Sequence, residues 1–401
     1  MSRPRPVAWI ALLAVLVISS PACAAPGPVT PVTTVPFHLI GSTIVLPVHV
    51  AKSDSLWFIL DTGAGHGSVT LARAQELGLG FGGQSQAQGA AGRVESRQLK
   101  SYDVRLGTIA LPIEHGSSFP LESMSPRMGH VVDGIVGSEL FQRYVVEIDY
   151  AHSTLRLYEP KAFKYEGTGE RLPLTYTVNL PYTQAAVDLS DGRHLEGRFV
   201  LDTGSSQAVI LLPAFADKEK VAATLGKTVD MVGLAVGGET PTRVGRLAAL
   251  EMGKLRLERP LVSISTGGPG YFAAQGSAGN IGGAVFKKFR CTWDYSRNEL
   301  ILDSTGDLAD PVPFDASGLV LVAAGAAFDT VQVSRIIPES PAAEAGLQPG
   351  DRLLSVDGTP VSDLGVVRIR ERLRRQGDTV QLAVSRGERT WTVPLTLRPL
   401  L

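Results

Sequence analysis

Hydrophobic and polar residues alternate along much of the chain with the period of two that is typical of β-strands. The alternation is plain in STIVLPVHV, which starts at Ser42, and in YVVEIDY, which starts at Tyr144. Turn signals such as LGT around Gly107 and SDGR around Gly192 separate these runs. The chain also has 43 glycines and 26 prolines, which favour tight turns over long helices. The pattern therefore predicts a mainly β protein.

Helical spacing is confined to short stretches. LARAQELG begins at Leu71 with apolar residues at helical intervals, and Gly78 fits the C-terminal end of a helix. A second short helix is expected in SELFQRY, directly after Gly137. Neither stretch is long enough to change the assignment of the chain as mainly β.

The β pattern occurs twice. FILDTGAG at 58–65 matches FVLDTGSS at 199–206, and both read aromatic residue, two aliphatic residues, Asp-Thr-Gly and small residues. Downstream, DGIVGSELFQRYVVEIDYAHSTLRL at 133–157 aligns without a gap with AGNIGGAVFKKFRCTWDYSRNELIL at 278–302. The two aspartates are 141 residues apart and the two downstream blocks are 145 residues apart. This spacing indicates the duplication of a whole lobe, because solenoid repeats are far shorter.

The repeated motif places an acid where a buried strand ends. A site built from both copies would contain Asp61, Thr62, Gly63 and Ala64 from the first and Asp202, Thr203, Gly204 and Ser205 from the second. The glycines lack a Cβ atom, so the backbone can approach the carboxylates and direct N–H groups at them. The threonine hydroxyls could bond across to the other lobe. One Asp-Thr-Gly alone would indicate an ordinary turn, but two copies in matched frames predict a pair of facing aspartates.

Two carboxyl groups a few ångströms apart hold one proton between them, because both cannot ionise cheaply. Such a pair acts as base and acid together. The ionised group takes a proton from water, the water attacks an amide carbonyl, and the protonated group supports the charge that develops on oxygen. This chemistry needs no metal and no organic cofactor, and we expect neither. The chain has no His-Glu-x-x-His motif, no Ser/His/Asp pattern and no clustered histidines.

The two hydrophobic-hydrophobic-Asp-Thr-Gly motifs, each with a later hydrophobic-Gly block such as IVG at 135–137, resemble those of the pepsin/retropepsin-like aspartic peptidases. The chain most resembles bacterial exported aspartyl proteases that carry a C-terminal PDZ domain. The resemblance implies a bilobal double β-barrel with lobes at 33–160 and 161–306. It implies Asp61 and Asp202 as the catalytic dyad, with the Ser205 hydroxyl supporting its neighbouring aspartate, and a cleft for an extended polypeptide substrate.

The resemblance also implies flaps, which are hairpins that close over the substrate. The expected flap tips are Gly89, Ala90, Ala91 and Gly92 in the first lobe and Gly237 and Gly238 in the second. The first segment lacks the tyrosine usual in pepsin flaps. Two similar flaps would be closer to the symmetric retroviral plan.

Two residues depart from the family pattern. Asn280 stands where the pattern has an apolar residue, in the NIGG block of the second lobe. His66 follows the first motif, and we expect it to be a solvated or hydrogen-bonded loop residue. The alternative is that His66 tunes the pH response of Asp61 as a close neighbour.

The pattern changes after Leu302, where a connector rich in Pro, Gly and Asp begins. The segment VQVSRIIPESPAAEAGLQPGDRLLSVDGTPV then resembles a PDZ domain, which we place at 314–401. The resemblance implies VVRIRERLRR as the groove helix and a peptide ligand, with a partner's C-terminus as one possibility. The implied peptide-binding residues are Ser317, Gly318, Leu319 and Val320.

An alternative is that the module only packs against the lobes or a second copy, because ASGL at 316–319 lacks the second glycine of the usual carboxylate-binding loop. The arginines between 368 and 375 are expected on a solvated helix face and not in an anion site.

The N-terminus has the form of a secretory signal peptide, which we place at 1–24. A basic start, the apolar stretch VAWIALLAVLVI and the small residues of SSPACAA follow one another, so we expect export to the periplasm or the medium. Lipidation of Cys23 is an alternative, although Ser20 stands where lipoprotein signals carry Leu, and only lipidation would bring the protein to a membrane.

Cys291 is then the one remaining cysteine, expected as a small buried residue. A net charge of −1 suggests no nucleic-acid partner.

Two functions from different classes fit these features. The first is an exported aspartic endopeptidase whose PDZ domain recruits or positions substrate, with a PDZ-gated enzyme as a variant. The second is a catalytically inactive protein with a protease fold that binds peptides through the PDZ groove. Intact Asp-Thr-Gly motifs in both lobes favour the first, since an inactive dyad usually loses one aspartate.

Overall fold

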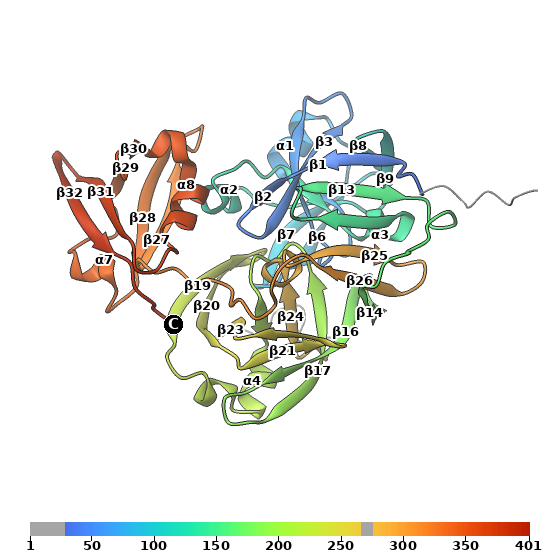
Figure 1. Ribbon diagram of the computed structural model, residues 1–401. Coiled ribbons are helices and arrows are strands. Elements are labelled where there is room, and N and C mark those ends of the chain that lie inside the picture. Colours follow the sequence, from blue (N-terminus) through green and yellow to red (C-terminus); the bar gives the residue numbers. More distant parts are fainter. Residues whose placement is uncertain (1–28, 266–275) are drawn as a thin grey trace, which may run out of the picture.

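The computed structural model describes residues 29–265 and 276–401 (Figure 1). This part of the chain is mainly β, with two lobes and a C-terminal module, so the predicted fold class is confirmed. The signal peptide expected at 1–24 and the lipidation considered at Cys23 lie outside the described residues. Across the described ranges, no helix combines the length and the apolar character that a membrane crossing requires.

The first lobe is a 10-stranded sheet with three short helices. Its strands are β2 (His38–Ile40), β3 (Thr43–Val50), β4 (Leu56–Leu60), β5 (Ser68–Val69), β6 (Phe81–Gln88), β7 (Arg93–Leu99), β8 (Tyr102–Leu106), β9 (Ile109–Ile113), β10 (Ser117–Ser118) and β11 (Gly134–Val136). They lie in the order β6-β7-β10-β5-β11-β4-β3-β8-β9, and β2 pairs with β3. The helices are α1 (Leu71–Glu76), α2 (Met124–Met128) and α3 (Ser138–Arg143). Helices α1 and α3 occupy the two stretches that the sequence predicted to be helical.

The second lobe repeats this plan with another 10-stranded sheet. Its strands are β15 (Thr175–Thr177), β16 (Leu180–Asp188), β17 (His194–Asp202), β18 (Val209–Leu211), β19 (Val229–Ala235), β20 (Gly238–Arg246), β21 (Ala249–Met252), β22 (Leu255–Glu258), β23 (Leu261–Ser265) and β24 (Gly279–Gly282). The order β19-β20-β23-β18-β24-β17-β16-β21-β22, with β15 on β16, matches the first lobe strand for strand. Its helices are α4 (Pro213–Lys218), the 3-10 turn η1 (Val221–Thr224) and α6 (Gly283–Phe286). The duplication in the sequence is therefore also a duplication of topology.

A six-stranded sheet joins the two lobes. It runs β1 (Thr33–Pro36), β13 (Thr154–Tyr158), β12 (Val145–Asp149), β25 (Phe289–Asp294), β26 (Glu299–Ser304) and β14 (Glu170–Pro173). The lobes meet where Ile148 of β12 pairs with Cys291 of β25. Cys291 is fully buried and free, as expected. Because strands from both lobes share backbone hydrogen bonds here, the sheet fixes one lobe relative to the other.

The C-terminal module has its own sheet and its own apolar core (Figure 1, orange to red). Its strands are β27 (Leu319–Ala324), β28 (Thr330–Ile336), β29 (Arg352–Val356), β30 (Thr359–Pro360), β31 (Thr379–Arg386) and β32 (Arg389–Thr396), and its helices are α7 (Pro341–Glu344) and α8 (Val361–Arg372). Strand β27 lies at the edge of the order β27-β28-β29-β31-β32. Gly365 interrupts α8 with a φ of +68°, so the continuous helix beside β27 starts at Val366.

Candidate active site

The two aspartates of the repeated motif lie at matching strand ends. Asp61 follows β4, which pairs in parallel with β11, and Asp202 is the last residue of β17, which pairs in parallel with β24. The three apolar residues before each aspartate are buried, which anchors the strand in the core: Phe58, Ile59 and Leu60 in one lobe and Phe199, Val200 and Leu201 in the other. Each acid therefore emerges at a fixed point on a rigid strand.

Glycine brings the two acids together. A Cβ atom on Gly63 would lie 2.7 Å from Cγ of Asp202, and a Cβ atom on Gly204 would lie 2.4 Å from Cγ of Asp61. Any larger residue would collide with the opposite carboxyl group, so each loop must carry glycine for the acids to approach. The carboxyl groups of Asp61 and Asp202 are in direct hydrogen-bond contact. The structure thus brings together the two residues that the sequence singled out.

The threonines of the motif hold the lobes together through four buried hydrogen bonds. The backbone N–H of Thr62 donates to Oγ1 of Thr203 at 3.0 Å, and the N–H of Thr203 donates to Oγ1 of Thr62 at 3.0 Å. Each hydroxyl then donates across the interface, Thr62 to the carbonyl of Leu201 at 2.7 Å and Thr203 to that of Leu60 at 2.8 Å. Both threonines are fully buried, so each hydroxyl has both roles satisfied away from water.

The two carboxyl groups have different partners. Asp61 accepts a hydrogen bond at Oδ1 from the Gly63 N–H at 2.7 Å. Asp202 accepts one at Oδ1 from the Ser205 N–H at 3.0 Å and a second at Oδ2 from the side-chain amide of Asn280. The Ser205 hydroxyl accepts from the Gln207 N–H at 3.4 Å, and the observed support of Asp202 by Ser205 comes from the backbone N–H.

These partners decide where the shared proton resides. Burial and then the neighbouring charge of Asp202 raise the pKa of Asp61 well above its usual range. Burial also raises the pKa of Asp202, but hydrogen bonds from Asp61, Asn280 and Ser205 oppose that rise. The Asn280 amide stabilises an ionised Asp202 and has no counterpart at Asp61, so the donors around the pair favour Asp61 as the carrier of the shared proton.

Sequence reasoning noted Asn280 as a departure from the family pattern but assigned it no role in the site. It is 2% exposed and occupies the position that Ile135 holds in the first lobe. Its Oδ1 atom has no hydrogen-bond partner among the described residues, so its side chain is fixed by the bond to Asp202 alone. A polar residue at a position otherwise apolar in the repeat was the signal that could have identified it.

The expected flaps are real hairpins whose tips meet. The β6–β7 hairpin carries Gly89 to Gly92 at its tip, and the β19–β20 hairpin turns at Val236 and Gly237, with Gly238 opening β20. The N–H of Ala91 donates to the carbonyl of Val236 at 3.0 Å. A Cβ atom on Gly89 would lie 2.1 Å from that same carbonyl oxygen. The two tips therefore touch through their backbones and leave no room for a side chain at Gly89.

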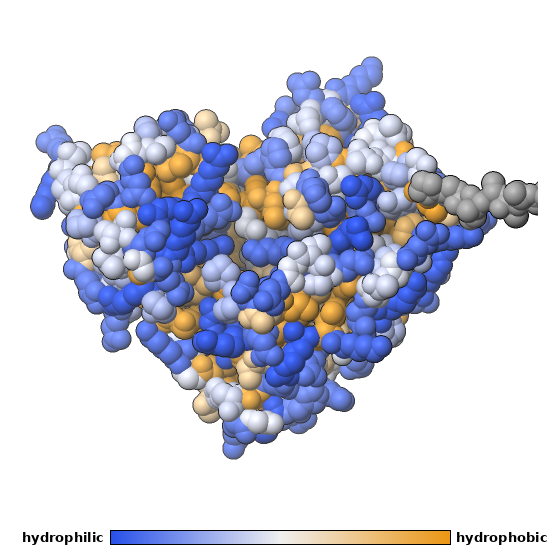
Figure 2. Space-filling view, viewed as in Figure 1, coloured by the Kyte–Doolittle hydropathy of each residue, from blue (hydrophilic) through white to orange (hydrophobic). Residues whose placement is uncertain are grey.

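A cavity of about 980 Å³ lies between the flaps and the dyad. It is lined by Asp61 and Asp202, by flap-tip residues including Gly89, Ala90 and Val236, and also by residues of the C-terminal module such as Val320. The space-filling view shows a notch between that module, at the left, and the first lobe, with apolar surface along its walls (Figure 2).

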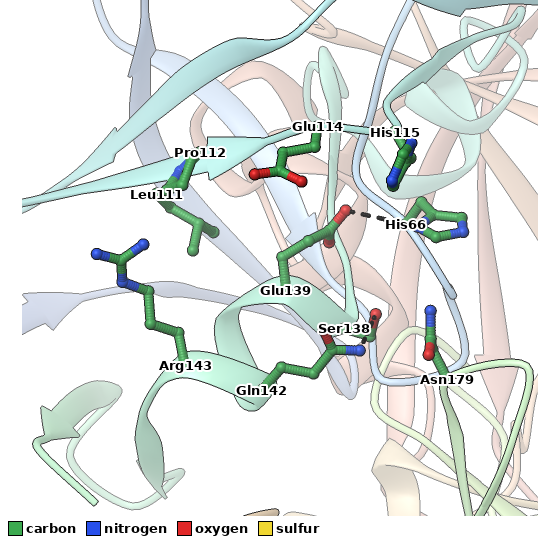
Figure 3. Close-up of a pocket in the computed structure, with 10 residues that line it drawn as sticks. All are labelled: His66, Leu111, Pro112, Glu114, His115, Ser138, Glu139, Gln142, Arg143 and Asn179. Carbon is green, nitrogen blue, oxygen red and sulfur yellow. Dashed lines mark hydrogen bonds and ion pairs between the residues drawn. The ribbon is translucent and has the colours of Figure 1, made fainter.

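A smaller pocket of about 380 Å³ adjoins the loop after Asp61 (Figure 3). His66 Nδ1 lies 3.8 Å from Oε1 of Glu139, and the Gly67 N–H donates to both carboxylate oxygens of Glu139 at 2.9 and 3.1 Å. The side chain of His66 is 44% exposed, which agrees with the expected solvated loop residue. Glu139 therefore anchors the loop that carries the first motif.

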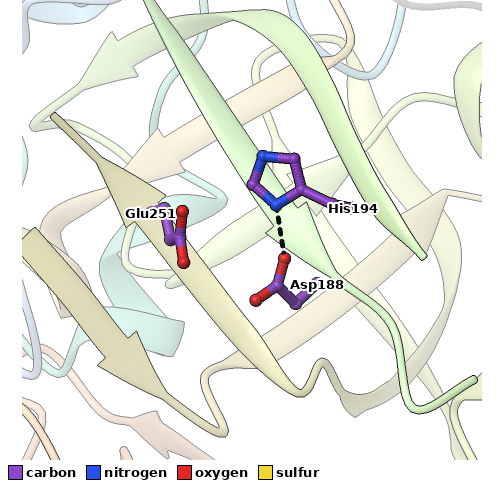
Figure 4. Close-up of side chains that lie close together, drawn as sticks. All are labelled: Asp188, His194 and Glu251. Carbon is purple, nitrogen blue, oxygen red and sulfur yellow. Dashed lines mark hydrogen bonds and ion pairs between the residues drawn. The ribbon is translucent and has the colours of Figure 1, made fainter. Parts of the chain in front are cut away.

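One group of side chains in the described ranges has the spacing of a cation site. The ligand atoms of Asp188, His194 and Glu251, from β16, β17 and β21, lie within 4.8 Å of one another (Figure 4). The guanidinium group of Arg256 already donates to both Asp188 and Glu251, and His194 Nδ1 lies 2.7 Å from Asp188. The arginine supplies the positive charge that these acids require, so the group forms an ion-pair network on the surface of the second lobe.

The expected peptide-binding residues of the C-terminal module lie where β27 begins. Ser317 and Gly318 form the preceding loop, and Leu319 and Val320 open the strand. The backbone N–H groups of Ser317 and Gly318 donate to Oδ1 of Asp315, and that of Leu319 donates to the Ser317 hydroxyl.

One residue of the arginine-rich helix also differs from expectation. Arg370 is half-buried and donates to two backbone carbonyls, so its assignment to a solvated face is wrong.

Comparison with protein families finds an aspartyl protease domain twice, over residues 46–140 and 185–283, and a PDZ domain over residues 317–385. Both lobes are aspartyl protease domains, and the C-terminal module is a PDZ domain. The two protease matches contain Asp61 and Asp202 respectively, and the PDZ match begins at the loop before β27.

One curated relative shares a short stretch with this chain. A protein of Mesorhizobium japonicum named "Putative zinc metalloprotease" is 44% identical over 64 residues. The match covers 16% of this chain and 17% of the length of that protein. A likeness over so small a share carries no activity from one protein to the other.

Proposed function

We propose that this protein is an aspartic endopeptidase that hydrolyses peptide bonds with Asp61, Asp202 and an activated water. The observation that carries the proposal is the direct contact of two carboxyl groups across a pseudo-symmetric interface, with the pKa of Asp61 raised well above its usual range. A turn that only capped backbone groups would need neither this approach nor the four cross-lobe threonine bonds.

The different partners of the two acids give each a role. Ionised Asp202, supported by Asn280 and the Ser205 N–H, takes a proton from a water, and the water oxygen forms a bond to the amide carbon. Asp61 gives its proton to the carbonyl oxygen as charge develops there. Asp202 then returns its proton to the amide nitrogen, the C–N bond breaks, and a hydroxyl proton of the tetrahedral intermediate returns to Asp61.

An extended polypeptide is the proposed substrate. The cavity between the flaps and the dyad is bordered by the edge strands β6 and β19, which can add a strand through backbone hydrogen bonds. Because the flap tips are in contact with each other, the substrate enters only when Ala91 and Val236 separate.

The test is hydrolysis of denatured casein from acidic to neutral pH by the wild type, Asp61→Asn and Asp202→Asn, with and without pepstatin. We expect both single variants to lose activity by at least a thousandfold while remaining folded, since neither carboxyl group works alone. Activity that survives either substitution contradicts the dyad. No cleavage by any folded variant would favour the alternative of an inactive, peptide-binding protein.

We also propose that the chain is exported, on the basis of the signal-peptide pattern in its first 24 residues. Mass spectrometry of the protein purified from a bacterial host checks this directly. A mature N-terminus after Ala24 or Ala25 supports export by cleavage, and a lipid on Cys23 would indicate membrane attachment instead.

A further inference from the structure

The loop that captures a ligand's carboxylate in PDZ domains is already filled in this protein. Oδ1 of Asp315 accepts the N–H groups of Ser317 at 2.9 Å and Gly318 at 2.6 Å. The N–H of Leu319 donates to the Ser317 hydroxyl at 3.0 Å, and that hydroxyl donates to Asp315. A PDZ ligand's C-terminal carboxylate needs backbone donors from this loop. Here the three successive N–H groups all have internal acceptors.

The groove itself holds a segment of the first protease lobe. The end of α2 lies against β27 and α8, the two elements that form a PDZ groove (Figure 1). A Cβ atom on Gly129, which ends α2 with a φ of +65°, would lie 2.4 Å from Cγ1 of Val366 and 3.7 Å from Cβ of Ala323. Val366 is on α8 and Ala323 on β27, so Gly129 sits between the groove helix and the groove strand.

Arg370 joins α2 to the groove strand through hydrogen bonds. Its guanidinium group donates to the carbonyl of Arg127 in α2 at 2.6 Å and to the carbonyl of Leu321 in β27 at 2.7 Å. The first bond satisfies a carbonyl in the last turn of α2, which has no partner inside so short a helix. The second occupies a carbonyl of the edge strand that an added peptide strand could otherwise use. Burial lowers the pKa of Arg370 to about 10, and the guanidinium remains charged at neutral pH.

The same segment reaches the flap of the second lobe. The side chain of Arg127 donates to the carbonyl of Val232 in β19 at 3.2 Å and pairs with Glu239 of β20. Apolar residues of the PDZ domain cover the flap strand directly, because Ile337 and Leu400 pack with Val229 and Met231. The groove, α2 and the flap thus form one continuous set of contacts.

We propose that the PDZ groove binds Met124–Gly129 of the first lobe as an internal ligand, in place of a free C-terminus, and that this contact holds the second-lobe flap closed. A partner acts by displacing α2 from the groove, and the class of partner is an internal chain segment that ends a helical turn in a small residue. Recognition does not depend on a terminal carboxylate, because Asp315 occupies its place.

Peptide binding to the full chain after residue 24 tests the proposal by fluorescence anisotropy. One labelled probe copies residues 121–133, and the other is a hexapeptide ending in Ala-Leu-Val with a free or an amidated C-terminus. In Gly129→Ala the new Cβ atom collides with Val366 and expels the internal segment, so the first probe should bind at least tenfold tighter than to the wild type. The hexapeptide should bind equally with either C-terminus.

The matched control is Gly78→Ala. Gly78 follows α1 with a φ of +64°, but a Cβ atom there meets nothing within 4 Å. The control therefore introduces the same backbone strain without the collision and should bind the probe as the wild type does. Arg370→Gln is the second variant, since it removes both carbonyl bonds without adding atoms to the groove, and thermal melts show that each variant is folded.

Two results would overturn the proposal. One is wild-type protein that binds the free hexapeptide at least tenfold tighter than its amide. The other is no gain in probe binding in either folded groove variant. Asp315→Ala combined with Gly129→Ala should create the preference for a free carboxylate that the wild type lacks, because the loop N–H groups lose their internal acceptor.

A second arm measures casein hydrolysis and rests on the proposed function. Gly129→Ala should cleave at least threefold faster than the wild type, and Gly78→Ala should not. If no variant cleaves casein, the proposed peptidase activity fails, while the anisotropy results still decide what the groove binds. If the variants cleave at equal rates although α2 is displaced, the link between groove and flap is wrong.

Discussion

The side-chain amide of Asn280 donates a hydrogen bond to Oδ2 of Asp202. The first lobe has Ile135 at the equivalent position, which cannot donate to Asp61. The two lobes share strand order and motif, and the Asn280 amide is a side-chain donor that Asp202 has and Asp61 lacks. Because the donor stabilises the ionised form, it favours Asp202 as the base of the pair.

The first prediction concerns Asn280→Ile, which makes the second lobe resemble the first. Loss of the donor raises the pKa of Asp202, so the acidic limb of kcat/KM should move to higher pH by about one to two units. The pH dependence of peptide hydrolysis measures this shift. Ile135→Asn is the reciprocal variant. It adds a donor near Asp61 and leaves the donor to Asp202 in place, so it should not reproduce the shift of the acidic limb to higher pH. An unmoved limb in Asn280→Ile would show that the amide has no role in the dyad.

Asn280→Ile should also leave stability nearly unchanged. The Oδ1 atom of Asn280 lacks a partner among the described residues, and burying an unsatisfied polar atom costs free energy. An apolar side chain removes that cost and offsets the lost hydrogen bond. Urea unfolding distinguishes this from a structural role, which would lower the free energy of unfolding by several kcal/mol.

The second prediction concerns the cross-lobe threonines. Thr62→Val removes the hydroxyl that donates to Leu201 and accepts from the Thr203 N–H, leaving both groups buried without a partner. The free energy of unfolding should fall by about 2 to 4 kcal/mol, measured by urea denaturation. Thr292→Val is the matched control, because Thr292 is equally buried but its hydroxyl has no partner among the described residues. A similar loss in both variants would contradict the role of the cross-lobe bonds.

The third prediction concerns the contact between the flap tips. Gly89→Ala places a Cβ atom against the Val236 carbonyl, so the bond from the Ala91 N–H to that carbonyl should break. Hydrogen exchange at Ala91 should then be at least tenfold faster. Gly83→Ala on the same hairpin adds a Cβ atom that meets nothing within 4 Å, and exchange should stay at the wild-type rate. Exchange at Ala91 that is as fast in the wild type as in Gly89→Ala would mean that the tips do not meet in solution.

The fourth prediction concerns the pH dependence of stability through Asp315. Burial raises the pKa of this carboxyl to about 6 in the folded protein, above its value of about 4 in an unfolded chain. The folded state therefore binds the proton more tightly, and the stabilisation is full below about pH 4 and lost as pH rises through 6. Relative to Asp315→Asn, the wild type should lose about 3 kcal/mol between pH 4 and 7, as measured by urea unfolding.

A control separates this effect from the other acids of the chain. Asp329→Asn changes an exposed residue of the same domain and should follow the wild type at every pH. A constant difference between the wild type and Asp315→Asn from pH 4 to 7 would show that the carboxyl titrates normally.

Much of the architecture could be predicted because its signals are local. Alternation of apolar and polar residues identified the strands. A repeat with matched spacing identified two lobes, since two stretches with the same pattern are expected to form the same strand order. The aspartates, threonines and glycines of the motif were predicted for the same reason: each follows directly from a buried strand whose end is visible in the sequence. The flaps themselves were implied by the resemblance, and glycine-rich turns indicated the position of their tips.

The sequence by itself determined the pair of aspartates on which the proposed chemistry rests, because the duplicated Asp-Thr-Gly motif allows few other arrangements. Only the tertiary structure decided how the two acids differ and what the PDZ groove holds. Asn280 lies 78 residues beyond Asp202, and Arg370 lies 243 residues beyond Arg127. Bonds over such distances depend on how sheets and domains pack, and no local pattern encodes them. Asp315, which fills the carboxylate loop, is close in sequence to the N–H groups that it accepts. The segment that occupies the groove, α2, comes from a different domain, and no sequence pattern points to it.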